Sequence, residues 1–206
     1  MDFLHLDERI MQLIDNEKFD VAEDELHKAK LQASSAADHD ALDHVLSLLV
    51  TLHRSKQPAD LTKAESYCLE RERIIGTGYA KLQYAMTLYW AMDDSTRTVT
   101  KAREAIVASR QEGDDKTAYQ SFGLLGLALL DLHQNDEAIR VLDEIQKMVA
   151  ARLRIVVGDE TLFLERLRAQ TKDLKTIATI QGIAKTLWPV CRDPQFSARL
   201  QRLAEL

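Results

Sequence analysis

The sequence predicts an all-α fold built from helical hairpins that repeat along the chain. The 206 residues include only 7 Gly, 3 Pro and 6% aromatic side chains, whereas a β-rich fold needs more turn and aromatic residues. Residues 125–142, LGLALLDLHQNDEAIRVL, carry apolar side chains at helical spacing on both sides of a polar turn. Alanines also recur at intervals of 42, 38, 36 and 40 residues, a period typical of helical solenoids, at Ala22, Ala64, Ala102, Ala138 and Ala178.

The first two predicted hairpins occupy about residues 3–33 and 39–74. In the first, one helical face carries Phe19, Ala22, Leu26 and Ala29. In the second, Pro58 interrupts the two helices because proline does not fit a helix interior, and Asp60 is a natural N-cap for the second helix.

The third and fourth predicted hairpins occupy about residues 78–111 and 116–153. The segment IIGTG before the third supplies two glycines that end the preceding helix. The fourth has the clearest pattern. Its small residues Gly126 and Ala138 are expected to let its two helices approach each other closely.

The fifth hairpin, about residues 160–188, has Asp159 and Asp173 as expected N-caps and ends at Trp188-Pro189. A last amphipathic helix, about residues 194–206, carries Phe196, Leu200 and Leu203 on one face. Terminal repeats need a cover for their apolar face, so this helix is predicted to cap the array. The whole chain, 1–206, is predicted to form a single domain.

Residues 117–150 resemble a tetratricopeptide repeat. The matching positions are Phe122, Leu125-Gly126, Ala128 and Leu129 before the turn, followed by Ala138, Leu142 and Ile145. The first unit matches through EKFDVAEDELHKA, and the third places Tyr89 where the family prefers Gly or Ala. The resemblance implies that the hairpins form a right-handed superhelix, an α-solenoid, whose concave wall is lined by the first helix of each pair.

Members of this family generally hold a peptide or a helix of a partner protein on that wall. Carried over to this sequence, the wall positions are Met86, Trp90, Gln120, Gly123, Leu127, Leu130 and Asp131. Such a groove is apolar and acidic, unlike the basic walls that grip the C-terminal carboxylates of heat-shock chaperones. It favours an amphipathic helix or an extended apolar peptide as the partner. The alternative is that Trp90 and Met86 only pack against the neighbouring hairpin.

Charge leaves two further alternatives open. The net charge is −7 over residues 1–60, −4 over 61–146 and +5 over 147–206, so oppositely charged ends allow a homodimer or homo-oligomer. The basic C-terminal segment also allows nucleic-acid association, although the chain as a whole is acidic. Its basic residues include Arg152, Arg154, Arg166, Arg168, Lys172 and Lys175.

No pattern for catalysis or for a cofactor is found in the sequence, and no enzyme activity is expected. His39, Asp40, Asp43 and His44 have metal-ligand spacing on one predicted helix, but an exposed acidic face has the same pattern, so no metal is expected. Cys68 and Cys191 are expected to be buried or half-buried thiols. Without a signal peptide or a membrane-length apolar run, the protein is expected to be cytoplasmic and not in a membrane.

Overall fold

The computed structural model describes residues 5–151 and 157–205, and over these residues the chain forms eleven α-helices, one short 3-10 helix and no strand. The predicted all-α class is therefore confirmed. The chain divides into two compact units, Met1–Gly76 and Thr77–Leu206, each with its own hydrophobic core. A single domain over residues 1–206 stays a prediction.

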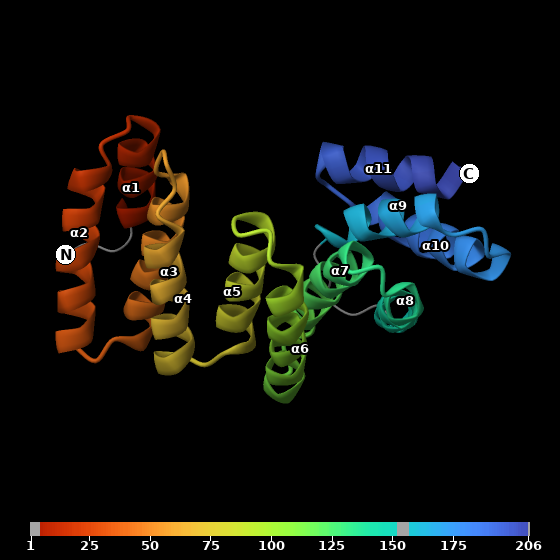
Figure 1. Cartoon of the computed structure of the whole chain (residues 1–206), viewed down its shortest axis with the longest axis horizontal. Helices are drawn as coiled ribbons and strands as arrows, with labels where there is room; N and C mark the ends of the chain where they lie inside the picture. The colour runs from red at the N-terminus through yellow and green to blue at the C-terminus, as the bar shows by residue number, and fades with distance from the viewer. Residues whose placement is uncertain (1–4, 152–156, 206) are drawn as a thin grey trace. The chain divides into compact units, whose positions relative to one another are not determined.

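Unit 1 contains α1 (Leu6–Asp15), α2 (Phe19–Ser35), α3 (His39–Ser55) and α4 (Leu61–Ile74). Figure 1 shows these helices in red to gold, with α2 beside α1 and α4 beside α3. The predicted apolar face of α2 is buried at Ala22, Leu26 and Ala29. It packs against α3, whose Leu46, Leu49 and other aliphatic side chains complete the core.

Unit 2 contains seven α-helices in its described residues. They are α5 (Gly78–Trp90), α6 (Ser95–Glu112), α7 (Asp115–Asp131), α8 (Asn135–Ala150), α9 (Glu160–Gln170), α10 (Leu174–Leu187) and α11 (Pro194–Glu205), with the 3-10 helix η2 (Trp188–Val190) before α11. In Figure 1, α7 lies between α6 and the later helices. It packs against α5, α6, α8 and α9, and is therefore the central helix of this unit.

Side-chain caps begin many of the helices. Asp60 accepts the Lys63 backbone N–H at 3.1 Å, and Asp173 accepts that of Thr176 at 2.8 Å, which confirms both predicted N-caps. Asp159 precedes α9 but makes no capping hydrogen bond. Asp159 therefore occupies the predicted N-cap position, but its side chain does not cap the helix and instead lines a pocket described below.

The small residue Gly126 has a different partner from the one expected. A Cβ atom at this position would lie 2.6 Å from the ring of Phe163 on α9. The expectation that Gly126 opens space for the second helix of its own hairpin is corrected, since the missing side chain makes room for the Phe163 ring. Gly126 therefore joins one hairpin to the next.

Helix α11 continues this packing. Leu200 and Leu203 are buried as the predicted apolar stripe requires, while Phe196 is only partly buried. The helix contacts α9 and α10. Cys68 is buried and Cys191 is half-buried, which confirms that prediction. Within residues 5–151 and 157–205, no helix has both the length and the apolar character required to cross a membrane.

Candidate functional site

Three of the predicted wall residues lie in the core of unit 2. Leu127 is 0% exposed and Leu130 is 1% exposed, and Gly123 is buried against the backbone of Glu160. The expectation that these three residues face a groove is therefore wrong. Helix α7 has neighbours on several sides, so the side chains that the repeat pattern assigns to an exposed wall are covered.

Asp131, the last predicted wall residue on α7, connects this helix to its neighbours. Its carboxylate forms an ion pair with Arg166 on α9 and accepts a hydrogen bond from Ser95 at 3.3 Å. Arg166 also donates a hydrogen bond to the Tyr89 hydroxyl on α5 at 3.0 Å. Burial, together with Asp131, raises the pKa of Tyr89 to about 12. Asp131 thus joins four helices, and its negative charge is already compensated by Arg166.

Two of the three remaining wall residues, Met86 and Gln120, line a pocket of about 220 Å³ on unit 2. Met86 comes from α5 and Gln120 from α7. Its apolar lining consists of Leu82, Met86, Leu124, Val157 and Phe196. Its polar lining comes from Gln120 and from the turn before α9, Gly158 and Asp159. The pocket therefore lies where α5, α7, α11 and the start of α9 meet.

Trp90 and Asp159 are connected at this pocket. The Trp90 side chain, 44% exposed, lies close enough to the Asp159 carboxyl group to lower its pKa. Burial has the larger effect and raises the pKa of Asp159, whereas the neighbouring Trp90 indole and the charge of Arg199 lower it. Of the two readings for Trp90, packing against a neighbour and exposure to a partner, the exposed indole ring is compatible with the second.

Glu160 forms the buried side of the same turn. Its two carboxyl oxygens lie 2.9 and 2.8 Å from the Gly158 nitrogen, which donates to them. The side chain is fully buried, and this burial raises its pKa to about 7. The buried Tyr119 hydroxyl lies beside this carboxyl group, yet has no hydrogen bond of ordinary geometry within the described residues.

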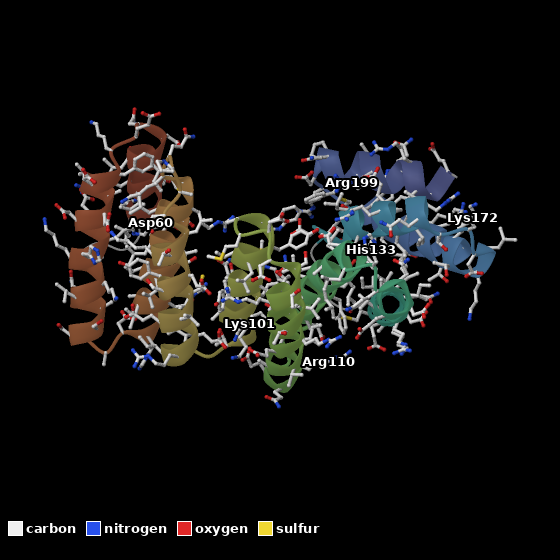
Figure 2. The ribbon with its side chains drawn as sticks, viewed as in Figure 1. Asp60, Lys101, Arg110, His133, Lys172 and Arg199 are labelled. Carbon is white, nitrogen blue, oxygen red and sulfur yellow. The ribbon has the colours of Figure 1, made fainter. Side chains whose placement is uncertain are left out.

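Arg199 on α11 connects that helix to the turn formed by Gly158 and Asp159. Its guanidinium donates to the Thr161 hydroxyl at 3.0 Å and pairs with Glu165 at 3.0 Å. Thr161 in turn donates to the Gly158 carbonyl at 2.9 Å. Figure 2 labels Arg199 on α11. The turn that lines the pocket is therefore fixed by Glu160, Thr161 and Arg199.

Unit 1 contains a polar cluster that the sequence analysis did not find. The imidazole of His53 is 0% exposed, with Nε2 at 3.5 Å from Glu23 and Nδ1 at 3.9 Å from Asp60. Glu23 also accepts from Lys56 at 2.6 Å and Lys63 at 2.9 Å. These contacts join three helices whose residues are far apart in sequence, so no local motif marks them.

The residues with metal-ligand spacing on α3 have other contacts. Arg71 donates to both carboxylate oxygens of Asp43, at 2.6 and 2.8 Å. His44 lies 2.5 Å from an Asp7 oxygen. Over residues 5–151 and 157–205, no cluster of three or more histidine, cysteine or acidic side chains has a geometry suited to a metal ion.

The basic C-terminal segment offers fewer free charges than its sequence indicates. Arg152 and Arg154 lie outside the described residues. Arg166 is paired with Asp131, and Lys172, labelled in Figure 2, lies in the turn between α9 and α10. The nucleic-acid alternative therefore depends mainly on Arg168, Lys172 and Lys175.

No protein-family model matches this chain, and no curated protein matches it either.

Proposed function

We propose that the chain is a non-enzymatic, tetratricopeptide-like adaptor that binds a segment of a partner protein on unit 2, around the pocket between α5, α7 and α11. The observation that carries this proposal is the position of Met86 and Gln120 in one pocket, with Trp90 connected to it through Asp159. These residues were expected to bind a partner on the basis of sequence alone. A superhelical arrangement of the hairpins, and a cytoplasmic location, belong to the same proposal.

The pocket has the chemical character of a recognition site. Aliphatic, thioether and aromatic side chains form most of its lining, and Trp90 presents a large exposed ring next to it. Exposed tryptophans with apolar neighbours commonly supply much of the energy of protein–protein binding. The pocket is too small to admit a folded domain, so we expect single side chains of a peptide or helix to occupy it.

Site-specific photo-crosslinking tests this function. A photoreactive phenylalanine analogue replaces Trp90 in one variant and Val107, which is 57% exposed on α6, in the control variant. Both are expressed in the source organism and irradiated. We expect position 90 to capture a defined protein that position 107 does not. Identical adducts at both positions, or none at position 90, would contradict the proposal.

Self-association is the second candidate. It is favoured by the opposite net charges of the N-terminal and C-terminal segments. The same crosslinking experiment reports it directly, because an adduct between two copies of this chain has twice the mass of the monomer. If the charged ends drive the association, the yield of this adduct should fall as ionic strength rises above about 0.15 M, where the Debye length is about 8 Å.

A further inference from the structure

We propose that the pocket of unit 2 receives one lysine side chain of the partner, with its aliphatic stem between Met86 and Phe196 and its ammonium group on Asp159. This inference rests on the proposed function and names the chemistry that the site selects. A lysine side chain combines a flexible apolar stem with a compact charge. The pocket offers the complement of both features.

The apolar part of the lining fits the stem. Leu82, Met86, Leu124 and Phe196 come from three helices and form most of the pocket surface. At about 220 Å³ the pocket holds one long side chain, but not an entire turn of helix. Burial of the four methylene groups of lysine against these residues is favourable by the ordinary hydrophobic effect.

The polar part of the lining fits the ammonium group. Asp159 presents a half-buried carboxyl group to the pocket and makes no capping hydrogen bond to α9. The Trp90 indole lies beside it, and a carboxylate accepts several donors at once. Gln120, which also lines the pocket, adds an amide oxygen as a second acceptor. Two acceptors therefore face the same small space.

The surrounding charges favour a cation over an anion. Arg199 lies near enough to influence Asp159, but it is already paired with Glu165 and bonded to Thr161. Arg202 also pairs with Glu165, at 3.0 Å. Glu160, directly next in the chain, adds negative charge whenever it is ionised. Burial raises the pKa of Asp159, which means that its carboxylate gains from a cation that replaces lost water.

Binding of two small probes tests this inference without any partner. N-acetyl-lysine amide and N-acetyl-norleucine amide have the same stem and differ by the terminal ammonium. The Trp90 indole N–H resonance is the reporter, since Trp90 lies beside Asp159, and Trp188 in η2 is the internal reference. Trp188→Phe assigns the two signals. We expect a saturable shift of the Trp90 signal, with about tenfold tighter binding of the lysine probe.

Asp159→Asn removes the charge but keeps the size of the side chain. We expect it to reduce the affinity for the lysine probe to that for norleucine. The matched control is Asp143→Asn, which makes the same change of net charge at an exposed position on α8 and should leave the tenfold preference intact. Tryptophan fluorescence during urea denaturation verifies that both variants are folded.

Each other outcome overturns the inference. Equal affinities for the two probes, no saturable shift up to the solubility limit, or an unchanged preference in Asp159→Asn would exclude a lysine site. The proposed function has a separate test, because crosslinking from position 90 does not depend on these probes. A crosslinked partner without lysine binding would leave the adaptor function standing and refute only the chemistry assigned to this pocket.

Discussion

Gly123 on α7 lies directly against Glu160 at the start of α9: a Cβ atom at position 123 would be 2.8 Å from the Glu160 nitrogen and 2.9 Å from its Cα. No side chain fits between these two backbones. The contact places the turn that carries Asp159 next to Gln120, and so it determines the shape of the pocket.

The first prediction follows from this contact. Gly123→Ala should destabilise unit 2 by about 1–3 kcal/mol, because the added methyl group would lie within 3 Å of Glu160 backbone atoms and force the two helices to shift. Urea denaturation followed by tryptophan fluorescence measures this effect, since both tryptophans, Trp90 and Trp188, belong to unit 2.

The matched control is Gly182→Ala on α10. A Cβ atom there has nothing within 4 Å, so alanine should stabilise the helix by up to about 1 kcal/mol through its higher helix propensity. If Gly123→Ala also increased the stability, the close contact between α7 and α9 would be disproved.

The helices of this protein could be predicted from sequence because their signals are local. Polar turns, helical spacing of aliphatic residues and capping aspartates such as Asp60 and Asp173 all act within a few residues. The partner of Gly126 could not be predicted in this way. A small residue indicates close packing, but the sequence does not state which helix approaches, and here it is α9.

The pocket was predictable in part, for a related reason. Met86 and Gln120, which line it, were identified as wall positions through the tetratricopeptide resemblance, as was Trp90 beside it. Leu127 and Leu130 occupy similar repeat positions but are buried, because additional helices cover that part of α7. Asp159 was interpreted as a cap, since only the folded chain brings it to Trp90. Phe196 reaches the pocket from α11, which is too distant in sequence to leave a motif.

The second prediction concerns the buried carboxyl group of Glu160. Its pKa is raised from 4.5 to about 7, so between these pH values the folded state binds more protons than the unfolded state. The stability of unit 2 therefore decreases as pH rises through this window, by about 3 kcal/mol in total. Glu160→Gln keeps an acceptor for the Gly158 N–H and has no such loss.

The experiment compares wild type and Glu160→Gln by urea denaturation at pH 5 and at pH 8, again by tryptophan fluorescence. The variant should gain stability relative to wild type at pH 8 and lose most of that advantage at pH 5. The comparison between the two proteins cancels the titration of other groups. A difference that is the same at both pH values would show that Glu160 is not buried as a titrating group.

The third prediction concerns the ion pair between Arg71 and Asp43 in unit 1. The Arg71 side chain is 3% exposed and donates two hydrogen bonds to the carboxylate. Arg71→Lys loses this two-pronged geometry and should lower the stability of unit 1 by about 1–2 kcal/mol. Thermal unfolding followed by circular dichroism measures the change.

The surface pair between Arg9 and Glu25 provides the control for that substitution. Arg9 is 69% exposed and lies 2.6 Å from the Glu25 carboxylate. Because exposed ion pairs contribute little, Arg9→Lys should change stability by no more than about 0.5 kcal/mol. Equal effects of the two substitutions would mean that burial of Arg71 adds nothing to its ion pair.

The fourth prediction concerns acid sensitivity through His53. Desolvation lowers the pKa of this imidazole below 6.5, and the positive charges of Lys56 and Lys63 lower it further. The carboxylates of Glu23 and Asp60 act in the opposite direction and raise it. The unfolded chain thus binds a proton at a higher pH than the folded chain does. The contribution of neutral His53 to stability is present above pH 6.5 and is lost as the pH falls below that value.

Two measurements check this sign. An NMR titration of the histidine side chains, with His53→Gln to assign the signal, should give a His53 pKa below 6.5. The melting temperature should fall less between pH 7 and pH 5 in His53→Gln than in wild type, because glutamine takes up no proton. An imidazole pKa above 6.5 would instead mean that Glu23 and Asp60, one facing each ring nitrogen, outweigh burial. Unit 1 would then become more stable on acidification through this residue.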